Sequence, residues 1–212
     1  DFLLGQAFKM MVEVGSLHAL DVLSTAATVI AEGEVMQLTV AKNTATTEDE
    51  YLAVIRGKTA ALFAAACEVG PIIAGKGKDE QAACRSYGAN LGIAFQLVDD
   101  ALDYGGTSSK LGKNLGDDFR EGKITLPLLR AIHHAAPSES KSIVAIVKSK
   151  KAGNKDVQRV IDFVDRHAGV ESAQETAFEL RQQAQEKIVS FPDSAYKTAL
   201  MDFANFVVTR ST

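Results

Sequence analysis

Tryptophan is absent from this sequence of 212 residues, and proline and cysteine are rare, with four and two copies respectively. Together with 16 glycines, these counts are too low for a collagen-like repeat, a flexible linker or an all-β chain with many turns. The two cysteines, Cys67 and Cys84, have neither CxxC nor CxxH spacing, so the sequence predicts neither a disulfide framework nor a zinc site. We therefore expect a reducing, cytoplasmic location.

A large charge of one sign and a long hydrophobic run are also missing. The formal net charge is -4, whereas proteins that bind nucleic acid usually present a basic surface. The longest uninterrupted apolar run, residues 60–67, is far shorter than the roughly 20 residues that cross a bilayer. The sequence thus predicts no nucleic-acid partner and no transmembrane segment.

What the sequence does contain is apolar residues at helical spacing, with weak strand signals throughout. Ser16 is suited to cap the first long helix, and Thr47 with Glu50 forms a capping-box signature before the second. Pro71 predicts a kink or an early end near Gly70 in that second helix. The three long helices are expected at residues 17–41, 51–74 and 80–104.

The simplest architecture for this pattern is a single all-α domain over residues 1–212. With 46% hydrophobic and 24% charged residues, the composition is that of an ordinary globular protein. We expect the core helices within residues 1–104 and amphipathic outer helices within residues 124–212. The segment 105–123 between them is predicted to be a long polar loop.

The third predicted helix carries an acidic stripe in apolar surroundings. Four polar residues follow the spacing i, i+3, i+4 and i+7 and share one helix face: Gln96, Asp99, Asp100 and Asp103. Burying such charges without partners is prohibitive, whereas Mg²⁺ binds carboxylates and shares them with substrate phosphates. The alternative is an acidic face exposed to solvent, which the apolar neighbours disfavour.

Basic residues lie on either side of this helix in the sequence. The glycine-rich segment 110–123 follows it, where glycines allow close backbone approach and lysines offer charge for phosphate oxygens. Lys58 and Thr59 precede it as candidate diphosphate contacts. Alternatively, they are a lysine extending along the surface and a space-filling threonine. Asp117 and Asp118 either assist a metal ion through water or cap a turn.

Three motifs, in this order, closely resemble those of the trans-type polyprenyl diphosphate synthases, including the octaprenyl and decaprenyl types: GKTAALF, FQLVDDALDYGG and LGKNLGDDFREGKITLP. The resemblance spans nearly the whole chain and implies the all-α helical bundle of the class I isoprenoid synthases. It implies an enzyme that ionises an allylic diphosphate with Mg²⁺, joins the resulting cation to isopentenyl diphosphate and releases pyrophosphate. It also implies a homodimer.

The same resemblance implies roles for individual residues. It makes Asp99, Asp100 and Asp103 the ligands of Mg²⁺. Gln37, which shares the GEVMQL segment with Glu34, is implied to be a polar contact of the substrate pocket. The implied catalytic residues, which also bind the substrate diphosphate, are Lys58, Thr59, Gln96, Lys113 and Lys123.

One departure from the family pattern is large. Family members have two aspartate-rich motifs, and the first belongs before the segment that begins at Asp1. We therefore expect that the chain holds the C-terminal portion of a synthase and shows little condensation activity by itself. Because product length in this family depends on residues near that first motif, the sequence predicts no product length.

Two other functions are compatible with such a bundle. One is a non-catalytic helical subunit of a hetero-oligomeric synthase, although such a subunit has no physical need for three buried carboxylates. The other is a terpene cyclase, but those enzymes typically carry an Asn/Ser/Glu metal motif, which this sequence lacks. The four histidines do not pair with one another at i, i+4 spacing, so we expect them to be surface or packing residues.

Overall fold

The computed structural model describes residues 2–41, 43–105, 115–149 and 153–210. Within those ranges every regular element is a helix, which confirms the all-α prediction. The elements are α1 (Phe2–Glu13), α2 (Leu17–Val40), α3 (Glu48–Ile55), the π-helix η1 (Arg56–Ala60), α4 (Ala61–Ile73), α5 (Lys78–Gly105), α7 (Asp117–Glu121), α8 (Leu126–His134), α9 (Pro137–Lys148), α10 (Asn154–Arg166), α11 (Gly169–Ile188) and α12 (Ala195–Thr209). No helix of the described residues is long and apolar enough to span a membrane.

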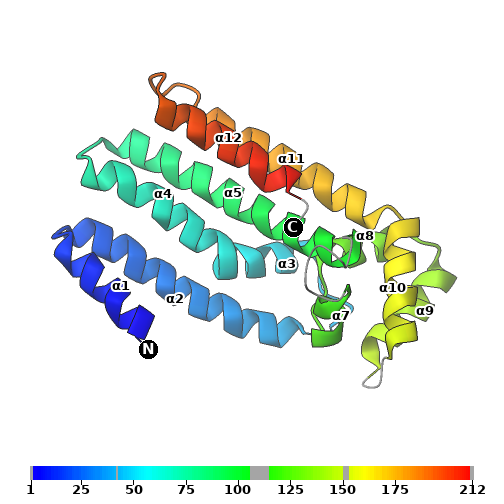
Figure 1. The fold of residues 1–212 in the computed structure, drawn as a ribbon. Coiled ribbons are helices and arrows are strands. Elements are labelled where there is room, and N and C mark those ends of the chain that lie inside the picture. The colour runs from blue at the N-terminus through cyan, green and yellow to red at the C-terminus, as the bar shows by residue number, and fades with distance from the viewer. Residues whose placement is uncertain (1, 42, 106–114, 150–152, 211–212) are drawn as a thin grey trace.

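The long helices lie side by side as a layered array, with α7 to α10 gathered at one end of it (Figure 1). The central rod is α5, because α4, α11 and α12 all pack against it. The π-helix η1 also contacts α5, and α2 contacts η1 from another side. This arrangement brings the segment around Lys58 next to the acidic end of α5.

The sequence correctly predicted the N-terminal caps of α2 and α3, but the C-terminal end of α4 less well. The Ser16 side chain accepts a hydrogen bond from the Ala19 backbone at 3.2 Å, and the capping box of Thr47 and Glu50 is present. Of the two alternatives predicted for Pro71, a kink or an early end near Gly70, the early end is wrong, because α4 runs through Pro71 to Ile73. A proline in the last turns of a helix removes one hydrogen bond close to an end that is already short of partners.

The second predicted helix is not one regular helix. Its α-helical hydrogen bonds are interrupted at η1, where the backbone N–H of Ala61 donates to the carbonyl of Arg56 and closes a wider, π-type turn. Such single π turns in α-helices are rare and frequent at functional sites. Here the π turn holds both Lys58 and Thr59.

Two hydrophobic clusters account for the packing. The first is built on α5 and includes residues of α3, α11 and α12, and the second joins α8, α9 and α10 to the end of α5 and to Phe119 of α7. Helix α11 packs against α5 and buries one face in the first cluster. The division into core helices within residues 1–104 and outer helices within residues 124–212 stays a prediction. Four side chains of α11 are fully buried in the first cluster: Ala173, Ala177, Ala184 and Ile188.

Glycines allow two helices to approach the π turn closely. A Cβ atom on Gly33 of α2 would lie 2.5 Å from the backbone nitrogen of Lys58, and one on Gly92 of α5 would lie 2.7 Å from the Cα atom of Ala60. Real Cβ atoms do not approach backbone this closely, so any larger residue at these positions must push the helices apart. The position of Lys58 relative to α2 and α5 thus depends on these two glycines.

We expect Gly92→Ala to lower the free energy of unfolding by roughly 1–3 kcal/mol, because the added methyl group overpacks the α5–η1 contact. Urea denaturation followed by circular dichroism measures the change. Gly70→Ala is the matched control, since a Cβ at this helical glycine meets no atom within 4 Å. It should leave stability unchanged or raise it by about 0.5–1 kcal/mol. Equal effects of the two substitutions would contradict the prediction.

Candidate functional site

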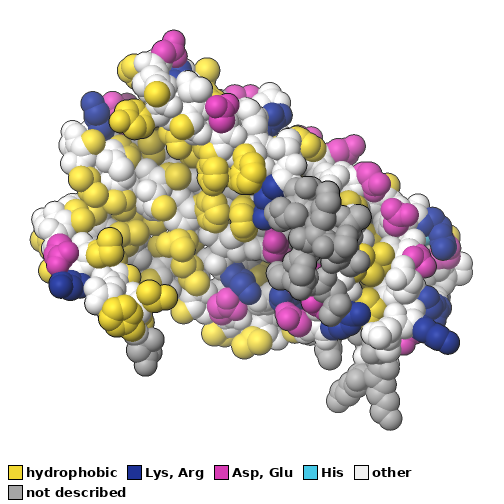
Figure 2. Space-filling model, viewed as in Figure 1, with side chains coloured by type: hydrophobic (Ala, Val, Ile, Leu, Met, Phe, Trp, Pro, Cys, Tyr) yellow, Lys and Arg dark blue, Asp and Glu magenta, His cyan; other side chains and the backbone are white. Residues whose placement is uncertain are grey.

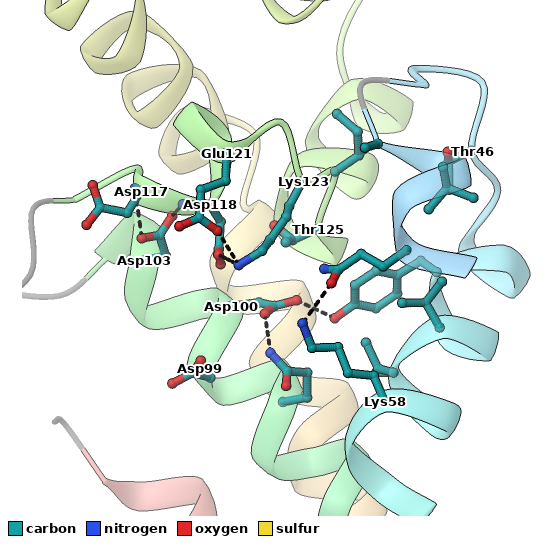
Figure 3. Close-up of a pocket in the computed structure, with 18 of the residues that line it drawn as sticks. Thr46, Lys58, Asp99, Asp100, Asp103, Asp117, Asp118, Glu121, Lys123 and Thr125 are labelled. Carbon is teal, nitrogen blue, oxygen red and sulfur yellow. Dashed lines mark hydrogen bonds and ion pairs between the residues drawn. The ribbon is translucent and has the colours of Figure 1, made fainter. Parts of the chain in front are cut away.

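A pocket of about 520 Å³ opens where α2, α3, η1, α5 and α7 meet. Figure 3 shows its polar side chains, which come from both the acidic end of α5 and the segment before α8. Thr59 lies just behind it, where it bonds to a lining residue, and Lys113 lies outside the described residues. The lining includes seven residues singled out from the sequence: Gln37, Lys58, Gln96, Asp99, Asp100, Asp103 and Lys123.

Asp100 is the most deeply buried acid of the site, with 3% of its surface exposed. The Tyr51 hydroxyl donates to its Oδ2 atom at 2.6 Å, and the Gln96 amide Nε2 donates to its Oδ1 atom at 2.7 Å. Thr59 Oγ1 in turn donates to Gln96 Oε1 at 2.9 Å. Burial raises the pKa of Asp100 to about 7 even though both hydrogen bonds favour its charged form.

Asp103 ties the end of α5 to the start of α7. Its two carboxylate oxygens accept hydrogen bonds from the backbone N–H groups of Asp117 and Asp118, at 3.1 and 3.2 Å, and its own carbonyl accepts one from Gly116 at 2.9 Å. Burial and the nearby charge of Asp118 raise the pKa of Asp103 to about 6. Asp103 is therefore the residue that caps this turn, whereas the side chains of Asp117 and Asp118 pair with Arg120 and Lys123. Assistance to a metal ion by Asp117 and Asp118 stays a prediction.

The lysine that follows α7 is held by acids. Lys123 Nζ lies 2.7 Å from Asp118 Oδ1 and 2.8 Å from Glu121 Oε2. Burial disfavours its charged form, but the two hydrogen bonds outweigh this effect and raise the pKa of Lys123 above its usual range. The ammonium group is therefore fixed at the pocket wall and stays charged.

Lys58 is held on the other side of the pocket by α2. Its Nζ atom donates to Gln37 Oε1 at 2.7 Å and lies 3.2 Å from Glu34 Oε1. Both α2 residues singled out from the sequence therefore contact this lysine. The side chain is 29% exposed, so the ammonium group is partly open to solvent.

Asp99 points away from Asp100, on the more open side of the helix (Figure 3). Its side chain is 46% exposed, and Oδ1 lies 3.7 Å from the guanidinium of Arg210. The Arg210 guanidinium also covers the ring of Phe95 at 4.0 Å and donates to the Phe95 carbonyl at 3.0 Å. Burial lowers the pKa of Arg210, and Asp99 opposes that change.

Sequence reasoning missed Tyr51 and Arg210. Tyr51 occupies an ordinary apolar position of a predicted helix, and Arg210 lies 111 residues after Asp99 in the sequence (210 minus 99). A tyrosine or arginine in an apolar stretch is a weak signal by itself, because both residues bury carbon while keeping a polar end. The folded chain is needed to show which carboxylate each one meets.

The donor chemistry of the pocket fits a hard divalent cation that is shared with a phosphate group. Within the described residues, no three acidic, histidine or cysteine side chains converge closely enough to enclose a metal ion by themselves. Mg²⁺, however, usually takes only one or two protein carboxylates and completes its shell with water and substrate phosphates. The carboxylates of Asp99 and Asp103 lie on adjacent turns of α5 and line the pocket.

Sequence comparison identifies similar proteins over the whole chain. A family model described as polyprenyl synthetase matches residues 1–164. The octaprenyl diphosphate synthase of Escherichia coli (strain K12) is 40% identical over 210 residues, which cover 99% of this chain and 65% of that protein. The all-trans-nonaprenyl-diphosphate synthase (geranyl-diphosphate specific) of Rhodobacter capsulatus is 35% identical and covers 99% of this chain and 64% of its own length.

Structure comparison also identifies polyprenyl and decaprenyl diphosphate synthases. A polyprenyl synthase from Caulobacter crescentus CB15, solved in complex with calcium and isoprenyl diphosphate, matches with a TM-score of 0.95 and 42% identity. A decaprenyl diphosphate synthase from Rhodobacter capsulatus matches with a TM-score of 0.90 and 43% identity. Each match covers 100% of this chain and 65% of the other, so the chain spans just under two thirds of the length of these relatives.

The raised pKa of Asp100 predicts how stability varies with pH in metal-free buffer. Because this pKa rises from 3.8 to about 7 on folding, the folded chain holds the proton more tightly than the unfolded chain. The resulting stabilisation is complete below the unfolded pKa and is lost as the pH rises through the folded pKa. Asp100→Asn removes the titrating group, so the variant should lose less stability than the wild type between about pH 4 and about pH 8. Urea denaturation at both pH values tests this, and an equal loss in the two proteins would contradict it.

Proposed function

Because the chain belongs to the polyprenyl synthetase family, we propose that it forms the diphosphate-ionising part of a trans-polyprenyl diphosphate synthase. Such an enzyme condenses an allylic diphosphate with isopentenyl diphosphate and releases pyrophosphate. The observation that carries the proposal is the charge of the pocket. Among its described lining residues, six carboxylates face only two lysines, Lys58 and Lys123.

That imbalance favours a metal-bound anion as the ligand. An anion alone would be repelled by a net negative pocket, and the carboxylates alone repel one another. Divalent cations bound together with a diphosphate satisfy both groups of charges. Mg²⁺, when bound, would neutralise the charge that accumulates on the departing diphosphate.

The side chains of this chain hold the diphosphate in that scheme. We propose that Asp99 and Asp103 contact Mg²⁺, with Asp100 behind them, and that Lys58 and Lys123 donate to phosphate oxygens. Both lysines are already held by oxygen acceptors at the pocket wall, so little reorientation is required. Thr59 and Gln96 keep the acidic helix in register with the π turn. Lys113 is proposed as a further diphosphate contact.

Apolar lining supports an ionisation reaction at this place. Beside the charged residues, the pocket is lined by Val40, Val54, Ile55, Leu102 and Ile124. Aliphatic walls exclude water, which would otherwise capture an allylic cation. They also provide a surface for the hydrocarbon part of the substrate.

The two alternative functions fit less well. A non-catalytic subunit does not require a buried acid with matched donors next to two held lysines. A terpene cyclase is disfavoured because the family model that matches the chain is that of the polyprenyl synthetases. The cytoplasmic location stays a prediction.

Calorimetry with Mg²⁺ and inorganic pyrophosphate tests the proposal. The chain should bind pyrophosphate only when Mg²⁺ is present, and Lys58→Met should weaken binding about 10- to 100-fold, the usual worth of a charge-assisted hydrogen bond. Lys141→Met, at an exposed position on α9, is the matched control and should bind like the wild type. Binding that is independent of Mg²⁺, or absent altogether, would rule the proposal out.

We further propose that the chain forms a homodimer through α1. No residue of this helix is buried, and four of its apolar side chains are strongly exposed: Phe2, Leu3, Leu4 and Met10. Figure 2 shows how far hydrophobic side chains extend over the face formed by the long helices. Exposed apolar area of this kind is usually covered by another protein surface.

Sedimentation equilibrium should give twice the mass of one chain. Leu4→Asp places a charge in the proposed interface and should shift the protein toward the monomer without loss of helical content. Val189→Asp is the control, because Val189 is equally exposed (62% against 60%) but lies at the end of α11. A monomeric wild type, or the same response to both substitutions, would contradict the dimer.

A further inference from the structure

We propose that Tyr51 is a positioning residue of the site. Its hydroxyl holds the Asp100 carboxylate and thereby fixes the rotation of α5 about its own axis, so that Asp99 and Asp103 present their carboxylates to the pocket. The proposal rests on the proposed function and adds to it a residue that the sequence motifs do not include.

The contact between Tyr51 and Asp100 is short and buried. The two oxygens are 2.6 Å apart, and the residues are 5% and 3% exposed. A carboxylate at this depth loses most of its hydration and depends on protein donors. Loss of the tyrosine hydroxyl would leave Asp100 Oδ2 without its donor, and the helix would have to shift to satisfy it.

The second oxygen of Asp100 is held by Gln96, which lies one turn earlier on α5. Gln96 donates to Oδ1 at 2.7 Å, and Thr59 of the π turn donates to Gln96 at 2.9 Å. Tyr51 and Thr59 flank Lys58 in the sequence. The segment that carries the lysine therefore holds the acidic helix at two points, one on each side of that lysine.

Helical geometry converts this hold on Asp100 into an orientation of its neighbours. With 3.6 residues per turn, Asp99 and Asp103 lie about 40° apart around the axis, and Asp100 lies roughly 100° from Asp99. When Asp100 faces Tyr51, Asp99 is thus turned about 100° away to the more open side, and Asp103 lies between the two, about 60° from Asp100. All three acids of the motif line the pocket, but Asp100 alone is held by Tyr51 and therefore anchors the helix.

A second buried tyrosine provides the control. Tyr87 is 2% exposed, and its hydroxyl donates to the Leu200 carbonyl at 2.7 Å. It lies on the same helix as Asp100 but does not line the pocket. Tyr87→Phe therefore removes a tyrosine hydrogen bond of similar length, in a part-buried position, without touching the acids.

The experiment compares Mg²⁺-dependent pyrophosphate binding by calorimetry with thermal unfolding by circular dichroism. Both Tyr51→Phe and Tyr87→Phe should lower the midpoint of unfolding. Only Tyr51→Phe should weaken pyrophosphate binding, by about tenfold at fixed Mg²⁺, and raise the Mg²⁺ concentration needed for half-saturation. Wild-type affinity in Tyr51→Phe, or the same weakening in Tyr87→Phe, overturns the proposal.

A double-mutant cycle with Asp100→Asn tests whether Tyr51 acts through Asp100. If it does, Asp100→Asn alone weakens binding and the double variant binds no worse than Asp100→Asn. If the losses add, Tyr51 acts on the ligand directly and not through Asp100, which overturns the proposal. If Asp100→Asn binds like the wild type, Asp100 does not position the helix, and the proposal is overturned even when Tyr51→Phe does not fold. A wild type that binds no pyrophosphate with Mg²⁺ overturns the proposed function itself and this inference with it.

Discussion

A buried carboxylate, that of Asp100, is the constraint around which the site is built. Removing a charge from water costs several kcal/mol unless protein groups replace the solvent, and here the replacements come from two other parts of the chain. Tyr51 reaches it from α3, and Gln96 relays the hold of Thr59 from the π turn. Helix α5 can therefore be seated in only one rotation and one register relative to the α3–η1–α4 segment.

The backbone at the π turn makes this seating possible. Gly33 and Gly92 bring α2 and α5 so close to η1 that a single methyl group on either would meet backbone atoms. The same approach places Lys58 beside Gln37 and Glu34 of α2. The close packing at the two glycines and the hydrogen bonds of Lys58 are thus satisfied by the same relative positions of α2, η1 and α5.

The sequence predicted the parts of this arrangement that are encoded locally. Helix starts at Ser16 and Thr47 follow from side-chain capping within three residues, and the acidic stripe of α5 follows from helical spacing. The π turn could not be predicted, because the polar interruption at residues 56–59 also fits a continuous α-helix and one extra residue in a single turn leaves no mark on composition. An amphipathic helix was predicted in this part of the chain, and α11 buries one largely alanine face. That this face packs on α5 could not be predicted, because small residues do not identify the partner helix.

Electrostatics explains why the lysines and the acids of the pocket need each other. Lys123 is held between Asp118 and Glu121, and Asp118 also has its backbone N–H bound by Asp103. A cation bound to Asp103 would neutralise part of its negative charge and so weaken the repulsion between Asp103 and Asp118. Asp118 could then hold Lys123 without this repulsion. An anionic ligand does the converse, because it gives the lysines a stronger acceptor and leaves the carboxylates in need of a cation. In the proposed function, each charge of a metal–diphosphate ligand would therefore strengthen the binding of the other, and the pair would bind more tightly than either component.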